Sequence, residues 1–161
     1  DTLLAIDADD VYALATRAHL LSSLGDREGA VAALERVIAI QPQHAPGWFN
    51  LGFLREELGR IDEAEQAFRQ AIAIDEKFDR AWYGLALCLI RQRRFDDAVV
   101  ALKRNTQLQP MSPYGWYQLA RVHVDRQEPE EAAKIIRHLR KFEPKVAAQL
   151  ERETGLVQPQ S

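Results

Sequence analysis

The side chains that most often do chemistry in proteins show no spacing here that favours catalysis or metal binding. No two of the four histidines stand four residues apart, and none has a neighbouring cysteine, as a helical metal site would require. Cys88 lies in an apolar stretch, so we expect a packed thiol rather than a nucleophile. Glu56-Glu57 and Glu130-Glu131 are sequential, and their carboxylates diverge around a helix instead of forming an acid/base pair. The histidines are His19, His44, His123 and His138.

Charge and motif content argue against several other function classes. The sequence has no Gly-rich phosphate loop and no nucleophile elbow. Lys and Arg number 21 against 24 Asp and Glu, which argues against a protein that binds along a phosphate backbone. The most basic stretch, residues 90–95, is followed by Asp96 and Asp97, so we interpret it as a solvated turn. No apolar run approaches the roughly 20 residues of a membrane span, and we therefore expect a soluble protein without enzyme activity, cofactor, metal or nucleic-acid partner.

A fixed interval runs through the sequence. Trp48, Trp82 and Trp116 stand 34 residues apart. A constant period of this length is typical of an array of stacked repeats rather than of a single globular core. The same interval relates the small residues Ala30, Ala64, Ala98 and Ala132, and the closing residues Pro42, Glu76, Pro110 and Pro144.

Each period divides into two helical stretches with a short break between them. Asp9 or Asp10 is expected to cap the first helix, Gly25-Asp26 breaks it, and Gly155 ends the last helix. We predict first helices up to residue 23 and over 45–58, 80–92 and 113–126. The second helices are predicted from the Gly25-Asp26 break to residue 40 and over 61–74, 95–108 and 129–142, followed by a shorter helix over 145–153.

Small residues recur where two helices must approach closely. Gly52, Ala86 and Ala120 follow the tryptophans by four residues, so they share the same helix face. A pair of helices joined by a short turn cannot bury its own apolar face, and we expect neighbouring pairs to stack. The large residues expected to fill the space between the helices are Leu34, Phe68, Leu102 and Ile136.

The order of these residues resembles a known repeat. The run Trp-x-x-Leu-Gly from Trp48 to Gly52, followed by Ala64, Phe68 and Ala71, is similar to the tetratricopeptide repeat, a helix-turn-helix unit of 34 residues. The resemblance implies an all-α, right-handed superhelical solenoid of antiparallel helix pairs with a C-terminal capping helix. Residues 4–7 read like residues 72–75, so the sequence is expected to begin in the second helix of an earlier repeat. The expected parts are the end of that helix at 1–8, repeats at 11–44, 45–78, 79–112 and 113–146, a capping helix and turn at 144–157, and a frayed tail at 158–161.

The sequence departs from the family pattern at several slots. The first repeat has Leu14 and Arg17 where Trp and Leu are expected. Arg93 and Gln127 replace the glycine of the turn between the two helices in the third and fourth repeats. Asn105 occupies a slot that is alanine in the second repeat. It is either a buried polar residue that needs a partner or a residue that local relaxation rotates into a wetter position, and we favour the second interpretation.

The first helices carry a second apolar and aromatic stripe, which is not needed for packing against the paired helix. Phe49 and Phe53 point away from the stripe that the paired helix covers, and aromatic residues and arginine are frequent binding hot spots. In the resembling family the first helices line the concave side, which implies a groove there for an extended or helical peptide. Alternatively, part of this stripe is ordinary core between successive first helices. The predicted groove residues are Tyr12, His19, Phe49, Asn50, Phe53, Arg80, Tyr83, Leu87, Ile90, Tyr114, Tyr117 and Arg121.

The predicted function is a non-catalytic scaffold that binds a protein or peptide partner. Two alternatives stay open, namely self-association into a homo-oligomer and a substrate-recruiting part of a longer enzyme. Because Cys88 is the only cysteine, the compartment stays open; we favour the cytoplasm, with the periplasm as the alternative. Some family members clamp acidic chaperone tails with five polar residues, but three of those slots fail here, so we expect no such clamp. The slots hold Ala15, His19, Asn50, Arg80 and Gly84.

Overall fold

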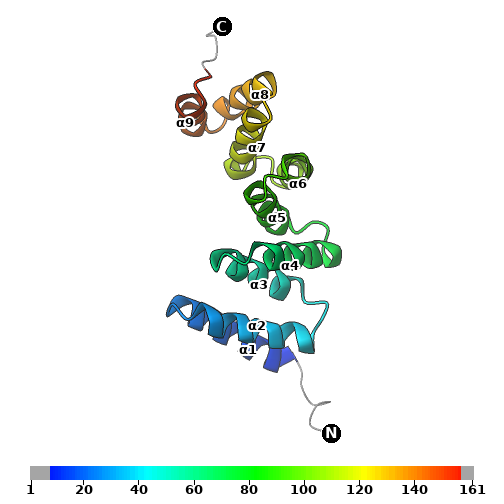
Figure 1. Ribbon diagram of the computed structural model, residues 1–161. Helices are drawn as coiled ribbons and strands as arrows, with labels where there is room; N and C mark the ends of the chain where they lie inside the picture. Colours follow the sequence, from blue (N-terminus) through cyan, green and yellow to red (C-terminus); the bar gives the residue numbers. More distant parts are fainter. Residues whose placement is uncertain (1–7, 157–161) are drawn as a thin grey trace. The chain divides into compact units, whose positions relative to one another are not determined.

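The computed structural model describes residues 8–156, and all regular secondary structure in that range is α-helical (Figure 1). The helix bounds agree with the predicted ones to within one or two residues, except at the start of the first helix. The helices are α1 Ala8–Ser23, α2 Arg27–Ile40, α3 Ala45–Glu57, α4 Ile61–Ile74, α5 Asp79–Arg91, α6 Phe95–Leu108, α7 Pro113–Asp125, α8 Pro129–Arg140 and α9 Pro144–Thr154.

The start of α1 differs from the prediction. Asp9 and Asp10 are themselves helical residues of α1, so neither caps the helix from outside. Ala8 is the first described residue of α1. The predicted end of that preceding helix, before Ala8, and the predicted tail at 158–161 lie outside the described residues.

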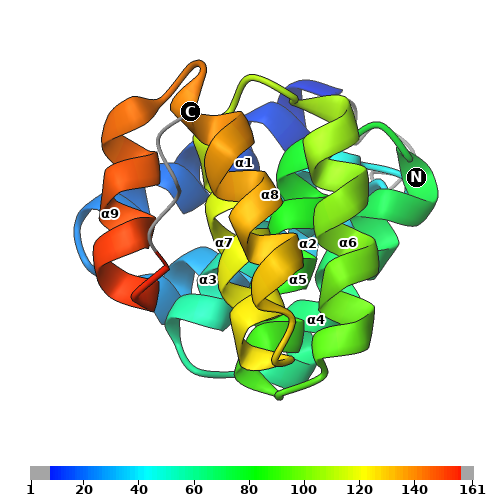
Figure 2. The same ribbon diagram turned by 90° about the horizontal axis from the view of Figure 1, so that it is seen from above.

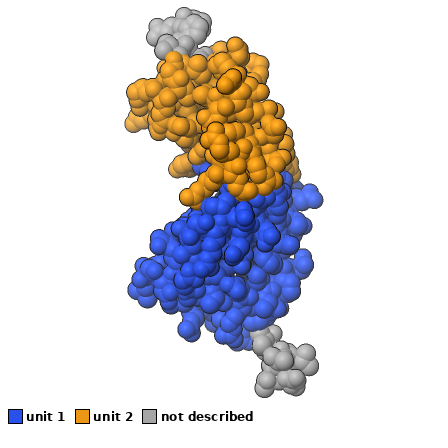
Figure 3. Space-filling model, in the orientation of Figure 1, with its two compact units in different colours: residues 1–88 blue, residues 89–161 orange. Residues whose placement is uncertain are grey.

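The protein divides into two compact units, residues 1–88 and 89–161, with the boundary inside α5 (Figure 3). In unit 1, α1 pairs with α2, α3 pairs with α4, and α2 packs against α3. In unit 2, α7 pairs with α8 and packs against α6. The short helix α9 lies against both α7 and α8 (Figure 2). Each unit is thus built from stacked helix pairs, as the period predicts.

The glycines of unit 1 accommodate one large ring. Phe68 of α4 is almost fully buried, at 1% exposure. A Cβ atom added at Gly52 of α3 would lie 3.0 Å from the Phe68 ring, and one at Gly84 of α5 would lie 2.5 Å from it. The ring therefore fits against two successive first helices only because both slots lack a side chain. This confirms the predicted role of Phe68 as a filler between helices.

The periodic tryptophans make the same hydrogen bond in each repeat. The indole Nε1 atoms of Trp48, Trp82 and Trp116 donate to backbone carbonyls six residues earlier, at 2.9, 2.9 and 2.8 Å. The acceptors are the carbonyls of Pro42, Glu76 and Pro110, which are the closing slots of the period. Because the acceptor is a backbone oxygen, Glu76 serves as well as proline.

Asn105 corrects one expectation. Its side chain is buried, at 6% exposure, and is not in the wetter position predicted for it. Room for the amide comes from α7, because a Cβ atom at Gly115 would lie only 2.1 Å from Asn105 Oδ1. Because Gly115 has no side chain, it leaves room for the buried amide of Asn105, and the helix does not need to relax. Cys88 is fully buried, which confirms the predicted packed thiol.

Candidate binding surfaces on the first helices

Three predicted groove residues, His19, Asn50 and Phe53, meet at one cleft in unit 1. The cleft has a volume of about 290 Å³ and lies between the first helices α1 and α3, above α2. It is lined by Ala15, Ala18, His19, Ser22 and Ser23 of α1, Leu34 of α2, and Asn50, Phe53 and Leu54 of α3.

The cleft combines an apolar floor with polar walls. Leu34 and Leu54 are buried at 2% and 4% exposure, whereas His19 and Asn50 are exposed. Phe53 is 50% exposed, so half of its surface is accessible to a ligand. The Ser23 hydroxyl donates to the His19 carbonyl oxygen at 3.0 Å, so it is turned back to its own helix. Such a site can accept an apolar side chain and fix an adjoining polar group.

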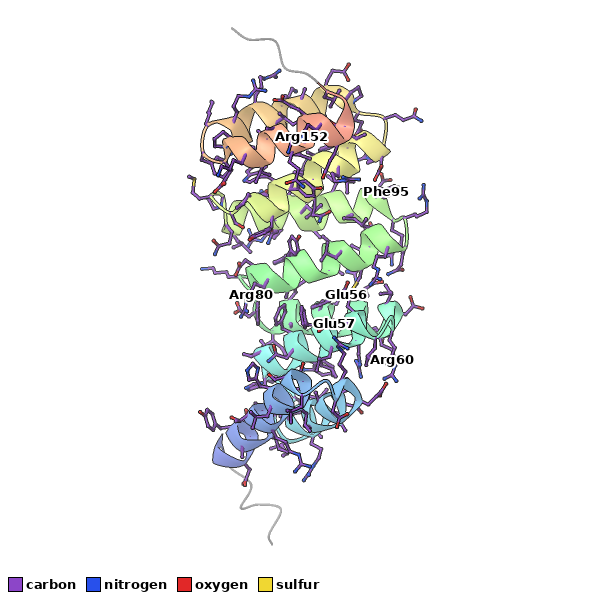
Figure 4. All side chains as sticks on the ribbon, turned by 90° about the vertical axis from the view of Figure 1, so that its left-hand side faces the viewer. Glu56, Glu57, Arg60, Arg80, Phe95 and Arg152 are labelled. Carbon is purple, nitrogen blue, oxygen red and sulfur yellow. The ribbon has the colours of Figure 1, made fainter. Side chains whose placement is uncertain are left out.

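Phe49 is held differently from Phe53, although both lie on α3. Its ring stacks on Phe78 at 5.1 Å between centroids and tilts against Phe68 at 5.8 Å. The Arg80 guanidinium lies 4.9 Å from the Phe49 centroid and 5.7 Å from the Phe78 centroid. Phe49 is thus part of an aromatic cluster whose solvent side is covered by exposed Arg80, which Figure 4 labels. Phe68 and Phe78 belong to the same repeat as Phe49, and only Arg80 comes from the next one, so Phe49 is held mainly by the core of its own repeat.

The remaining predicted residues of the first helices are not brought into the unit 1 cleft. Tyr12 is 74% exposed on α1 and is not among the residues that line it. Tyr83 and Leu87 are half-buried on the unit 1 part of α5, and Ile90 is half-buried on the unit 2 part. Tyr114 is 68% exposed at the start of α7.

In unit 2 the groove residues Tyr117 and Arg121 contact a carboxylate that the sequence reasoning missed. Glu153 of α9 accepts a hydrogen bond from the Tyr117 hydroxyl, at 2.9 Å to Oε1, and one from Arg121 Nη1, at 2.8 Å to Oε2. Gln149 Nε2 adds a bond of 2.9 Å from one turn earlier in α9. The i,i+4 spacing of Tyr117 and Arg121, and of Gln149 and Glu153, places each pair on one face of its own helix, but it does not indicate that the two pairs meet.

The contacts fix the charge state of this cluster. The hydrogen bond from Tyr117 lowers the pKa of Glu153, and the bonds from Gln149 and Arg121 lower it further. Burial raises the pKa of the Tyr117 hydroxyl, and its bond to Glu153 raises that pKa further. At neutral pH, therefore, Tyr117 and Arg121 act as donors and Glu153 is an ionised acceptor.

The family of the protein follows from a comparison with family models. Three models described as tetratricopeptide repeat match residues 16–77, 56–116 and 113–138, which together span residues 16–138. The chain belongs to the tetratricopeptide repeat family. It is an all-α array of tetratricopeptide repeats, as the period and its residues predicted. A comparison with curated protein sequences gave no match.

Solved structures share the fold of this tetratricopeptide repeat array. A crystal structure of MamA is 19% identical, with a TM-score of 0.76 over 94% of this chain and 86% of that one. The first tetratricopeptide repeat domain of Spaghetti (RPAP3), bound to the HSP90 peptide SRMEEVD, is 14% identical, with a TM-score of 0.73 over 76% and 97%. An O-GlcNAc transferase of Thermobaculum terrenum is 23% identical, with a TM-score of 0.69 over 82% of this chain and 26% of the transferase. At these identities the likeness concerns the fold alone.

Three of the four histidines have structural roles in capping, aromatic packing or a buried polar contact. His44 caps α3, because its Nδ1 accepts from Gly47 N at 2.8 Å. His138 packs edge-on against Trp116 and Phe142, with centroids 4.6 and 5.3 Å away. His123 is buried, and its Nδ1 lies 2.8 Å from Glu128 Oε1. The fourth histidine, His19, lines the cleft. Within the described range, no group of three or more His, Cys, Asp or Glu residues is placed to hold a metal ion.

Ion pairs gather at the turns between paired helices. In unit 1, Arg60 pairs with Glu28 at 2.8 Å, and Arg27 pairs with Glu57 at 3.2 Å; Figure 4 labels Arg60 and Glu57. Comparable surface pairs contribute about 0–1 kcal/mol each.

The basic segment over residues 90–95 leads into a similar turn of unit 2. There Arg94 pairs with Asp97 at 3.2 Å, and Arg93 lies over the ring of Phe95, which Figure 4 labels, at 5.4 Å from its centroid. These contacts agree with the interpretation of the segment as a solvated turn. No helix among residues 8–156 has both the length and the apolar character needed to cross a bilayer.

Proposed function

We propose that this tetratricopeptide repeat array is a non-catalytic scaffold that binds a segment of a partner protein along its first helices. The observation that carries the proposal is the cleft between α1 and α3, where His19, Asn50 and Phe53 converge over an apolar floor. His19 and Phe53 were predicted as groove residues from their helix face, and Asn50 from the slots of the family's clamp. Two neighbouring repeats thus contribute to one concave site, which is the usual form of a ligand site on a protein.

The lining of the cleft indicates the kind of segment that would fit. An apolar side chain of the partner would enter between Phe53 and Leu54 and cover Leu34. The Asn50 amide both donates and accepts hydrogen bonds, so it suits a peptide backbone, which presents N–H and C=O groups in turn. Phe53 would be the dominant anchor, because a half-exposed aromatic ring loses most water contact when a ligand covers it.

The proposal is tested with peptides selected from a random library on the immobilised protein. Binding of the selected peptides is then measured by fluorescence anisotropy to the wild type and to Phe53→Ala and Asn50→Ala. Loss of the ring is expected to weaken binding by about tenfold or more, which corresponds to about 1.4 kcal/mol. Val100→Ala serves as the matched control, since Val100 is an apolar residue, 65% exposed, on the second helix α6. Equal affinities of all variants, with helix content retained, would contradict the proposal.

Self-association is the second candidate, and exposed leucines favour it. Leu20 lies in the last turn of α1 and Leu24 directly follows the helix; they are 57% and 82% exposed. Apolar side chains that stand one turn apart and stay exposed often mark an interface. We infer that the end of α1 would then contact a second copy of the protein. Light scattering of the wild type and of Leu20→Ser/Leu24→Ser at high micromolar concentration should show a dimer only for the wild type, and a wild-type monomer would remove this candidate.

A further inference from the structure

The carboxylate of Glu153 lies where an external carboxylate would lie if Tyr117 and Arg121 were a binding site. Both donors stand on α7, a first helix, and both were predicted to face a ligand. Arg121 Nη1 reaches Glu153 Oε2 at 2.8 Å and the Tyr117 hydroxyl oxygen at 3.3 Å. The arginine thus holds both the carboxylate and the second donor in place. An arginine beside a hydroxyl donor is a common arrangement for binding a carboxylate.

The helix that supplies Glu153 is attached by few buried side chains. In α9 only Ala147 and Leu150 are buried. The preceding helix α8 buries Ala132, Ile135, Ile136 and Leu139. Helices with little buried apolar area open locally at a lower free-energy cost than the core around them. Release of Glu153 from Tyr117 and Arg121 is therefore expected to cost less free energy than unfolding of the α7–α8 pair.

We propose that Tyr117 and Arg121 form a carboxylate-binding site that Glu153 fills in cis. The external ligand would be a carboxylate of a partner peptide, supplied either by an acidic side group or by the peptide's C-terminus. The inference extends the proposed scaffold function, and it names a second contact point in unit 2 with its own ligand chemistry. Because it depends on α7 and α9 alone, it can fail while the cleft of unit 1 still binds peptide.

An internal carboxylate is a strong competitor. A group tethered to the same polypeptide acts at an effective concentration of roughly millimolar or more, so weak external ligands are excluded while it is bound. Truncation of Glu153 to alanine should then raise the apparent affinity for an external carboxylate without adding any contact to it. Truncation of a residue that only attaches α9 leaves Glu153 bound to the two donors, so the apparent affinity for the external carboxylate is expected to stay unchanged.

The test uses small carboxylates and amide chemical shifts of residues 118–122 in a ¹⁵N-labelled protein. N-acetylglutamate α-methylamide represents an acidic side group, and N-acetylglycine represents a peptide C-terminus. The neutral analogue N-acetylglutamine methylamide controls for the peptide groups. In Glu153→Ala the titration midpoint for at least one carboxylate should fall by about tenfold or more relative to the wild type. The second substitution Arg121→Gln should abolish that binding, because it removes the charged donor.

A matched control separates occupancy from attachment of α9. Glu151→Ala makes the same truncation on the same helix and breaks an ion pair with Arg140, but it does not touch Tyr117 or Arg121. Its titration midpoint should equal that of the wild type. An equal gain in Glu151→Ala and Glu153→Ala would overturn the inference, since loosening of α9 would then suffice. Unchanged midpoints in Glu153→Ala, or binding that survives Arg121→Gln, would also overturn it.

Discussion

At the scale of single residues, the turn between paired helices uses the same backbone conformation with different side chains. Gly25 and Gly59 have φ angles of 86° and 80°, and Arg93 and Gln127 fill the same slot at 60° and 61°. A residue with a Cβ atom pays about 1–2 kcal/mol for this left-handed conformation. The stacked helices therefore hold Arg93 and Gln127 in a backbone state that both residues disfavour.

Gln127→Gly is expected to stabilise the fold by about 0.5–1 kcal/mol. The relief of the left-handed backbone exceeds the entropy that glycine adds to the unfolded state, which is about 0.4–1 kcal/mol. Arg93→Gly should gain less, because it also removes the cation–π contact with Phe95. Urea unfolding of the variants measures both differences.

The reverse change provides the control at an equivalent position. A Cβ atom at Gly59 would meet nothing within 4 Å, so Gly59→Ala tests the backbone conformation without a steric clash. It should destabilise the protein by about 1 kcal/mol. A Gln127→Gly variant that is less stable than the wild type would show that the Gln127 amide group makes a compensating contact.

At the scale of elements, one ionisable pair ties α7 to α8. His123, near the end of α7, is buried, and it lies 2.8 Å from the carboxylate of Glu128, the residue before α8. The hydrogen bond with His123 lowers the pKa of Glu128, and Arg126 contributes to the same shift. The turn therefore carries a carboxylate that is more acidic in the folded protein than in the unfolded state.

The stability contributed by Glu128 should be present at neutral pH and should be lost as the pH falls. Because the folded pKa is the lower one, the contribution is fully present above the unfolded pKa of glutamate, about 4.3, and is lost as the pH falls through the folded pKa. The melting temperature of Glu128→Gln should thus lie below that of the wild type at pH 7, and the gap should narrow below about pH 4. Glu130→Gln, in the first turn of α8, is the control, and an equally pH-dependent gap there would contradict the assignment.

The sequence predicts the positions of the helices well, but it predicts the contacts of polar side chains with other helices poorly. The 34-residue period, with Gly or Pro near its breaks, places each helix because those residues act locally. Asn105 and Glu153 were missed for a different reason. Whether Asn105 is buried depends on Gly115 of another helix, and the partners of Glu153 depend on how α9 docks. Neither is encoded by neighbours in the sequence.

The same distinction holds for the candidate sites. His19 and Phe53 were predicted on one surface because successive first helices repeat the same face, Asn50 was predicted from the family's clamp slots, and all three line the cleft. Phe49 has the same face but packs on Phe78 and Phe68. Its packing depends on which side chains α4 and the end of its own repeat supply, and a helix face alone does not state this.

At the scale of the whole molecule, an array of repeats is expected to store its stability locally. Each repeat interacts mainly with its neighbours, so the free energy of unfolding is approximately a sum of repeat and interface contributions. Glu76 offers a site in unit 1 for testing this, because the equivalent residues are Pro42 and Pro110. The residue before it, Asp75, has φ −136° and ψ 96°, an extended conformation that a following proline favours.

Glu76→Pro should stabilise the fold by about 0.4–1 kcal/mol, since proline reduces the entropy of the unfolded state and the carbonyl that accepts from Trp82 is retained. Gln127→Gly acts in unit 2, with no side chain shared with the first site. The double variant should therefore gain the sum of the two single gains to within about 0.5 kcal/mol in urea unfolding. A gain well below that sum would mean that the two sites are energetically coupled, and that the repeats do not contribute to stability independently.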